Sequence, residues 1–200
     1  MLLKIDELTR ADHSFLIPED HCFYIREYTT AGYDASPDNQ LVFNLKCPIS
    51  HPNAGRLYYK GLAIQQAAMD ISKALNDIPV ADTVFIPLPP SKLAQTPGYD
   101  PRVRDMLRRA EATAGINVVE ALGIRAERAA AHETEDRPTV DELVANFVIN
   151  SLSWVGTKTV AIFDDVLVTG AQFRAAARVL RTYAPKANIV GLFWVRRTFP

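Results

Sequence analysis

The sequence predicts an α/β protein with an open, mostly parallel sheet that is flanked by helices. Short apolar runs alternate along the chain with stretches in which apolar residues recur every three or four positions, and the connections between them are short. This alternation is typical of parallel strands that are joined through helices. A chain of 200 residues is long enough for one such domain with a small appendage.

Three stretches have the periodicity of amphipathic helices, at residues 64–75, 103–114 and 173–180. A further helix is predicted to begin at Thr139, because Thr139 and Glu142 have the spacing of a capping box. The arginines from Arg102 to Arg109 fall opposite the apolar residues of the second helix, so we expect them on a solvated face. Residues 129–138 are polar without periodicity, which predicts a mobile loop.

Apolar runs predict strands at residues 84–86, 118–122, 146–149, 159–163 and 189–195. Near the N-terminus, residues 23–28 and 41–46 are rich in β-forming side chains and enclose turn-forming residues at 32–39, which predicts a β-hairpin. We therefore expect a β-rich N-terminal hood or cap, residues 1–60, followed by the α/β domain, residues 61–200.

Composition excludes several classes of protein. A net charge of −1 argues against broad affinity for nucleic acid, which usually needs a strong positive excess. Cys22 and Cys47 form no CxxC pair, and the four histidines lack zinc-finger spacing, so we expect free thiols and no structural zinc. The first residues are too charged for a signal peptide, and no apolar run could span a bilayer. These features favour the cytoplasm and argue against a membrane partner.

Two adjacent carboxylates, Asp164 and Asp165, directly follow the apolar run at 160–163. A buried strand seldom ends in two acids by chance, because burying an unpaired carboxylate is costly. In open parallel sheets, ligands bind beyond the C-terminal ends of the strands. We therefore expect the two acids at the C-terminal edge of the sheet, in a ligand site.

The turn that follows the acids has the composition of a phosphate-binding loop. Successive backbone amides in a turn that leads into a helix form an anion nest, which the helix N-terminus strengthens. Thr169 can add a hydroxyl donor, and Gly170 allows a close approach to the backbone. The acids repel phosphate and suit hydroxyl groups, or a divalent cation reached through water. A ribose 5-phosphate satisfies both halves. The expected phosphate loop comprises Val168, Thr169, Gly170, Ala171 and Gln172.

This segment resembles the motif of type I phosphoribosyltransferases that binds 5-phosphoribosyl-1-diphosphate (PRPP). The family shows an apolar run, two acids, two apolar residues and a short Thr/Gly loop. Ala161 departs from the pattern because a larger aliphatic residue is usual there. Gln172 departs from it because a Ser or Thr hydroxyl usually helps to hold the phosphate, although a Gln amide can also donate to phosphate.

The similarity extends over roughly residues 60–196 and is greatest to the ComF-like branch of the family. The Pro-rich segment 85–92, followed by residues 98–100, resembles that branch, with Pro97 in place of an Arg and Asp100 in place of an Asn. Arg137 and residues 146–147 are similar to its later Arg and Asn…Phe positions. The N-terminal zinc finger of many ComF proteins has no counterpart, because the necessary cysteines are absent.

The resemblance implies an enzyme that transfers the phosphoribosyl group from PRPP to a nitrogenous acceptor and releases pyrophosphate. It implies that Asp164 and Asp165 hold the ribose hydroxyls and stabilise the positive charge at C1. Mg²⁺ would be bound through PRPP, with the two acids as candidate ligands. A flexible loop that contains Arg137 would close over the site. The pyrophosphate loop would consist of Pro90, Ser91 and Lys92.

Two other functions are left open. A non-catalytic module that binds PRPP or a nucleotide, with a regulatory role or a role in DNA uptake, is favoured by Gln172 and Pro97. The complete set of two acids, a Thr-Gly turn and Lys92 favours the enzyme. A nucleic-acid-binding protein is disfavoured by the net charge. The residues leave the oligomeric state open, a homodimer included, and place Arg196 and Arg197 either in an exposed tail or in the hood.

Overall fold

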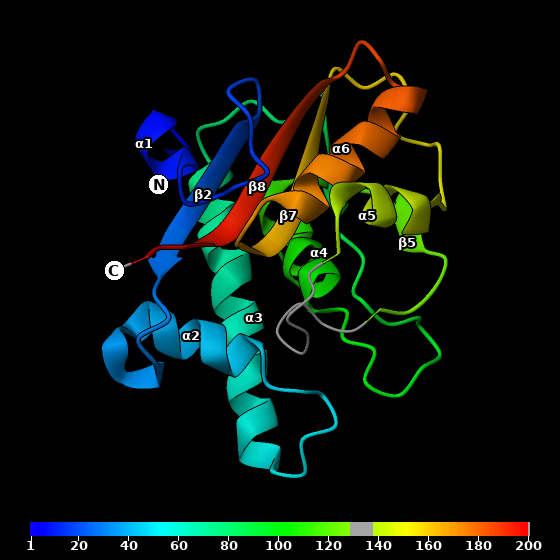
Figure 1. The fold of residues 1–200 in the computed structure, drawn as a ribbon. Coiled ribbons are helices and arrows are strands. Elements are labelled where there is room, and N and C mark those ends of the chain that lie inside the picture. Colours follow the sequence, from blue (N-terminus) through cyan, green and yellow to red (C-terminus); the bar gives the residue numbers. More distant parts are fainter. Residues whose placement is uncertain (129–137, 200) are drawn as a thin grey trace.

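A computed structural model describes residues 1–128 and 138–199 of the chain. Its centre is a six-stranded sheet in which only the outermost strand, β1, runs antiparallel to its neighbour (Figure 1). The predicted α/β class with a mostly parallel sheet is therefore confirmed. In spatial order the strands are β1 (Leu3–Lys4), β2 (His21–Tyr28), β8 (Asn188–Arg197), β7 (Thr159–Leu167), β3 (Thr83–Pro87) and β4 (Asn117–Val118).

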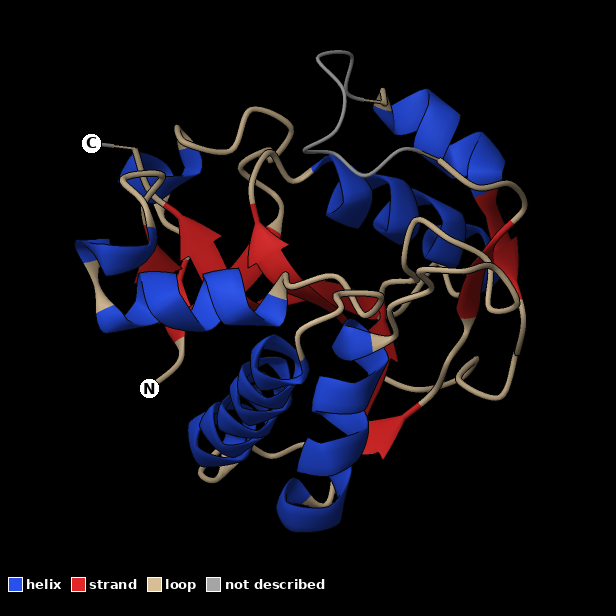
Figure 2. Ribbon diagram, turned by 90° about the horizontal axis from the view of Figure 1, so that it is seen from below, coloured by secondary structure: helices blue, strands red, loops and turns tan. Residues whose placement is uncertain are grey.

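Helices cover both faces of this sheet (Figure 2). The long helix α3 (Ala54–Leu75) and α4 (Arg102–Ala114) pack on one face, while α6 (Ala171–Tyr183) packs on the other and is covered by α5 (Val140–Asn146). Side chains of β7 alternate between two cores, because successive residues of a strand point to opposite faces. Val160 and Ile162 contribute to the core beneath α6, and Ala161 and Phe163 contribute to the core beneath α3 and α4.

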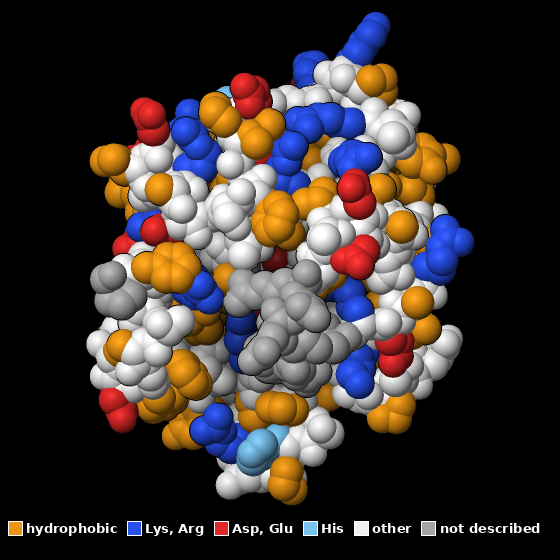
Figure 3. Space-filling view, viewed as in Figure 1, with side chains coloured by type: hydrophobic (Ala, Val, Ile, Leu, Met, Phe, Trp, Pro, Cys, Tyr) orange, Lys and Arg blue, Asp and Glu red, His pale blue; other side chains and the backbone are white. Residues whose placement is uncertain are grey.

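The predicted helices are confirmed, with the expected faces buried. In α6, Phe173, Ala176 and Leu180 are buried, while Arg178 and Arg181 are exposed. Figure 3 shows Lys and Arg side chains gathered over the position of α6. The helix predicted from Thr139 also forms, and both hydrogen bonds of its capping box are present.

The predicted N-terminal hairpin is wrong. Residues 23–28 do form a strand, but residues 41–45 belong to a helix, α2 (Pro37–Leu45), which packs against α3. Ser36 accepts a hydrogen bond from the Asn39 amide and Pro37 occupies the first turn, so this turn-rich stretch begins a helix. Strand β2 pairs in parallel with β8, so it extends the main sheet, and a separate β-rich hood over residues 1–60 is not confirmed.

The remaining elements are short. Helix α1 (Glu7–Arg10) and the 3₁₀ turn η1 (Tyr33–Ala35) flank β2. The strand predicted at 118–122 is divided into β4 and β5 (Leu122–Ile124), because only Asn117 and Val118 pair with β3. Strand β5 pairs antiparallel with β6 (Phe147–Ile149) in a second, two-stranded sheet.

Strand β7 is longer than predicted, and its length positions the two acids. It continues through Leu167 because β8 runs beside it up to Arg196. Strand β3, its other neighbour, ends at Pro87 opposite Phe163. Asp164 and Asp165 therefore lie at the C-terminal edge of the sheet, where one neighbouring strand has already ended, and this is the edge at which ligands bind in open parallel sheets.

The structure bears on two expectations, the state of the cysteines and the absence of a membrane-spanning helix. Cys22 and Cys47 are buried free thiols, as expected. Within residues 1–128 and 138–199, no helix combines the length and apolar character that a membrane span requires.

Candidate functional site

Asp165 forms an ion pair with an arginine that the sequence placed on a solvated face. The Nε atom of Arg102, at the start of α4, donates to Asp165 Oδ2 over 2.7 Å. Arg102 also donates through Nη1 to Asp100 Oδ2, again over 2.7 Å. The side chain of Arg102 is only 25% exposed, so the expectation of a solvated residue is wrong for this arginine. Helical periodicity could not reveal it, because its partner lies 63 residues away.

The same network reaches the N-terminal part of the chain through a buried lysine. Lys60, which is 5% exposed, donates from Nζ to Asp100 Oδ2 over 2.7 Å. It also donates to the carbonyl oxygens of Leu45 and Cys47, at the C-terminal end of α2. A buried ammonium is tolerated only when it is paired and hydrogen-bonded, and Lys60 meets both conditions. Helices α2, α3 and α4 are thereby tied to the acid pair.

The two adjacent acids have opposite pKa shifts. Burial raises the pKa of Asp164 well above its ordinary value, and the neighbouring charge of Asp165 raises it further. Burial acts in the same direction on Asp165, but the charges of Arg102 and Lys46, together with the hydrogen bonds from Arg102 and Asp164, outweigh it and hold the pKa of Asp165 below its ordinary range. Two close carboxylates cannot both ionise at low cost, so the pair shares one proton near neutral pH. The site therefore offers one carboxylate and one carboxylic acid to a ligand.

The expected phosphate loop is held by the N-terminal segment. The carbonyl oxygen of Val168 accepts from His13 Nδ1 at 2.5 Å, and that of Thr169 accepts from the Phe15 amide at 2.9 Å. In a trans peptide the carbonyl and the following N–H point in opposite directions. The amides of Thr169 and Gly170 therefore point away from this segment, and neither has an acceptor among the described residues. This geometry is that of an anion nest.

Gly170 is required at this position for two reasons. Its φ of +84° lies in the left-handed region that favours glycine. A Cβ atom there would lie 2.6 Å from Leu16 Cδ2, closer than real contacts allow. Gly170 is also the N-cap of α6, whose first turn contains no acidic residue, and the first amide of that helix, that of Ala171, donates to Thr169 Oγ1 over 3.4 Å. Ligand binding by residues 168–172 stays a prediction.

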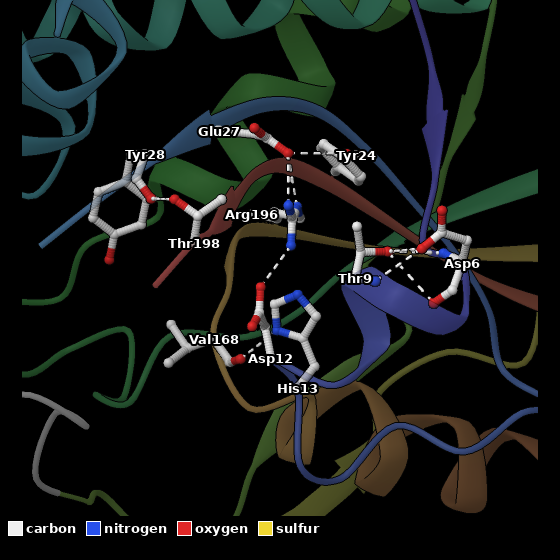
Figure 4. A network of polar contacts seen from close by, with 10 residues as sticks. All are labelled: Asp6, Thr9, Asp12, His13, Tyr24, Glu27, Tyr28, Val168, Arg196 and Thr198. Carbon is white, nitrogen blue, oxygen red and sulfur yellow. Dashed lines mark hydrogen bonds and ion pairs between the residues drawn. The ribbon is translucent and has the colours of Figure 1, made fainter. Parts of the chain in front are cut away.

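A network of ion pairs anchors the segment that braces the loop (Figure 4). Arg196 of β8 donates from Nη1 to Asp12 Oδ2 over 2.9 Å and forms an ion pair of 2.8 Å with Glu27. Arg196 is 8% exposed and its guanidinium lies 5.2 Å from the ring centroid of Tyr24. Arg196 is therefore not an exposed tail, and it links β8 to the N-terminal segment that binds the expected phosphate loop.

Arg128 is a second arginine that the sequence did not identify. Its Nη2 atom donates to Gln172 Oε1 over 2.7 Å, and its backbone amide donates to the Ser91 carbonyl over 3.0 Å. Its Nε atom is buried and has no hydrogen-bond partner within the part of the chain that the structure describes. Burial lowers the pKa of Arg128, and the carboxyl group of Asp164, when ionised, opposes that effect. Arg128 thus joins the expected pyrophosphate loop to the expected phosphate loop.

The predicted pyrophosphate residues are only partly brought together with the acids. Pro90, Ser91 and Lys92 are half-buried, and Ser91 is linked to the phosphate loop through Arg128. Lys92 lines a cavity of about 290 Å³ together with Pro90 and Tyr99, and neither Asp164 nor Asp165 lines that cavity. Arg137 lies outside the described residues, as do all but the last residue of the predicted loop at 129–138.

A Mg²⁺ ion fits this site only if it arrives with a ligand. Among the described residues, no group of three or more His, Cys, Asp or Glu side chains is arranged to hold a metal ion. One oxygen of Asp165 is already engaged by Arg102. Mg²⁺ usually binds through one or two carboxylates, several waters and substrate phosphates. Asp164 and the second oxygen of Asp165 fit that type of binding.

No protein-family model matches the chain, and no curated protein matches its sequence. The resemblance drawn from the sequence therefore stays a prediction, and the function has to be inferred from the geometry of these residues.

Removing the counterion of Asp165 is expected to destabilise the fold. Arg102→Met leaves a buried carboxylate without a partner, which lowers the free energy of unfolding by about 3 kcal/mol. The double variant Arg102→Met/Asp165→Asn removes both charges and is expected to regain most of the loss. Urea denaturation measures both effects, with Arg108→Met as the control for an exposed arginine on the same helix. A loss in Arg102→Met no larger than that in Arg108→Met would contradict the pairing.

His13 is expected to make the stability of the fold depend on pH. Nδ1 must carry the proton donated to Val168, and Nε2 is buried without a partner among the described residues. Burial lowers the pKa of His13, so the unfolded chain takes up a proton at a higher pH than the folded one. Stability from this group is present above the unfolded pKa of about 6.5 and is lost as the pH falls below it.

His13→Asn keeps a donor near Val168 but cannot titrate. Between pH 7.5 and pH 5.5, wild type should lose up to about 1 kcal/mol of stability relative to this variant. His21, which is exposed, supplies the matched control His21→Asn. Thermal or urea denaturation at the two pH values measures the difference, and equal pH dependence in wild type and His13→Asn would refute the role of His13.

Proposed function

We propose that the protein binds PRPP and transfers its phosphoribosyl group to a nitrogenous acceptor, in a Mg²⁺-dependent reaction that releases pyrophosphate. One observation carries the proposal. The amides of Thr169 and Gly170 point away from the N-terminal segment that binds the preceding carbonyl groups, and they follow shortly after two acids that share a proton at the C-terminal edge of the sheet. An anion site next to hydroxyl acceptors suits a sugar phosphate with vicinal hydroxyls.

The 5-phosphate would bind to the loop at 168–172. The N-terminus of a 13-residue helix favours a doubly charged anion, and α6 presents no acidic residue in its first turn. The resemblance of this segment to the PRPP motif points to the same assignment. The loop is braced from behind, so little ordering is needed when the phosphate binds.

The two acids would act on the ribose. Asp165 is tied to Arg102, whereas Asp164 has no ion pair among the described residues, and its proton can leave when Mg²⁺ arrives with the ligand. In the reaction, the bond between ribose C1 and the pyrophosphate oxygen breaks and a bond from C1 to the acceptor nitrogen forms. The carboxylates would stabilise the positive charge that develops at C1. Mg²⁺, when bound, would neutralise the negative charge of the departing pyrophosphate.

The pyrophosphate would lie against Pro90, Ser91 and Lys92. Lys92 would supply a point charge, and Ser91 a hydroxyl donor. These residues follow the end of β3, the strand next to β7, and Leu88 still donates its amide to the Phe163 carbonyl over 2.9 Å. The two loops thus leave the sheet from adjacent strands, as a ligand with phosphates at both ends requires.

A second candidate is a non-catalytic module that binds PRPP or a nucleotide, with a regulatory role or a role in DNA uptake. The observation that favours it is the occupation of the site by the chain itself. Asp165 is engaged by Arg102, and Gln172 is engaged by Arg128. A sensor needs binding without turnover, and a carboxylate held by an arginine is less available to a developing positive charge.

Titration calorimetry with PRPP, with and without Mg²⁺, tests the binding of PRPP, which both candidate functions require. We expect binding that strengthens with Mg²⁺, and we expect Asp164→Asn to weaken it by roughly tenfold, because a charge-assisted hydrogen bond to the ribose is lost. Asp82→Asn removes an exposed carboxylate at the other end of the sheet and is the control. If wild type does not bind PRPP at millimolar concentration, both candidates are wrong.

Release of pyrophosphate across a panel of nitrogenous bases then separates the two candidates. Turnover with any base, lost in Asp164→Asn and kept in Asp82→Asn, is the result expected of the enzyme. Tight binding of PRPP without turnover on any base would support the sensor in its place.

A further inference from the structure

We propose that Arg128 completes the 5-phosphate site of this chain, and that Gln172 positions its guanidinium over the phosphate loop. The inference rests on the proposed assignment of residues 168–172 to a phosphate group. It adds a phosphate ligand from outside the loop. Gln172 stands where the motif has a hydroxyl side chain, and together with Arg128 it would replace that hydroxyl group as a phosphate ligand.

The contacts of Arg128 place its side chain beside the first turn of α6. Nη2 donates to the side-chain oxygen of Gln172, the second residue of that helix, over 2.7 Å. The backbone amide of Arg128 is fixed on the Ser91 carbonyl over 3.0 Å, so the residue is held from the side of the Pro-rich loop. The guanidinium therefore lies between the two loops that would hold the two phosphate ends of PRPP.

Within residues 1–128 and 138–199, the hydrogen-bonding capacity of Arg128 is only partly used. A guanidinium has five N–H donors, and one of them meets Gln172. The buried Nε atom has no partner among the described residues, although an unsatisfied buried donor is costly. No ion pair of Arg128 with a carboxylate is formed within the described residues, whereas Arg102 and Arg196 each have two acidic partners. An incoming phosphate would satisfy these donors in the bidentate geometry that arginine favours.

The electrostatics of the surroundings favour an anion at the same place. Asp164 is the carboxyl group whose charge would act on Arg128. Burial and the charge of Asp165 raise the pKa of Asp164 and so favour its uncharged form. The first turn of α6 contributes the positive end of its dipole and contains no acidic residue. Arg128 thus adds a positive charge, with no ionised partner among the described residues, to amides that already favour an anion.

Gln172 has a length that a Ser or Thr side chain lacks. Its side-chain oxygen accepts from Arg128, which leaves its amide nitrogen as a further donor near the loop. A Ser at this position would be two atoms too short to reach the guanidinium. Gln172 is thus a positioning residue, and Arg128 is the group that would contact the phosphate.

Binding of ribose 5-phosphate without Mg²⁺ tests this inference separately from the proposed function. The ligand has the 5-phosphate but no pyrophosphate, so its affinity reports on the loop alone. We expect Arg128→Gln to weaken binding about tenfold or more, Arg128→Lys to weaken it less, and Gln172→Ser to weaken it without removing the charge. Arg178→Gln removes an exposed arginine from α6 and is the control, with no expected change.

The dependence of binding on pH and salt shows whether Arg128 contacts the phosphate or only links the two loops. In wild type, affinity should rise with pH as the phosphate takes its second charge near pH 6, and it should fall with salt. Both dependences should be shallower in Arg128→Gln, whereas a purely structural role would leave them unchanged and lower the melting temperature. The double variant Arg128→Gln/Gln172→Ser should bind no more weakly than Arg128→Gln, because Gln172 acts through Arg128.

The outcomes separate the two proposals. If wild type binds ribose 5-phosphate in a manner that depends on Arg128 but does not bind Mg²⁺–PRPP, the proposed function fails and the role of Arg128 stands. If Arg128→Gln binds ribose 5-phosphate as tightly as wild type, or if wild type does not bind it at millimolar concentration, the role of Arg128 is wrong. Loss of folding in Arg128→Gln together with wild-type affinity in Arg128→Lys and Gln172→Ser would also overturn it.

Discussion

The ion pair between Asp165 and Arg102 is the interaction on which the arrangement of the site depends. A parallel strand that carries two adjacent carboxylates into a protein interior needs a counterion, since an unpaired buried charge costs several kcal/mol. Arg102 provides the counterion from α4, and Asp100 joins Arg102 to Lys60 on α3. Because Lys60 also binds the carbonyl groups at the end of α2, one charge on the central sheet fixes three helices on the same face.

The expected phosphate loop, residues 168–172, is held by different contacts. Its carbonyl groups are bound from behind by His13 and Phe15, so its amides face outward without help from a ligand. Arg196 and Asp12 hold that brace to the sheet, and Leu16 closes the space at Gly170. The fold thus places two preorganised features side by side, a nest of free amides and a pair of acids with one proton. Preorganisation of this kind lowers the entropic cost of binding.

The sequence predicts what is local and misses what depends on distant contacts. Periodicity correctly predicts the three long helices and the central strands, because each buries one face against the same sheet. It fails at residues 41–46, where β-forming side chains follow a Ser-Pro helix start, and tertiary packing on α3 favours a helix. The acids and the Thr-Gly turn can be found from their spacing. Arg102, Arg128 and His13 cannot, because their partners are 63, 44 and 155 residues away.

The central claim is that the amides of Thr169 and Gly170 form a preorganised phosphate site. Two-dimensional ¹H–¹⁵N NMR of the intact chain during titration with PRPP tests it most directly, because each amide gives its own resonance. The account predicts that these two resonances move downfield and saturate together with the binding curve, as expected for amides that gain a charged acceptor. Saturable binding that shifts other amides and leaves those of Thr169 and Gly170 unmoved would contradict it.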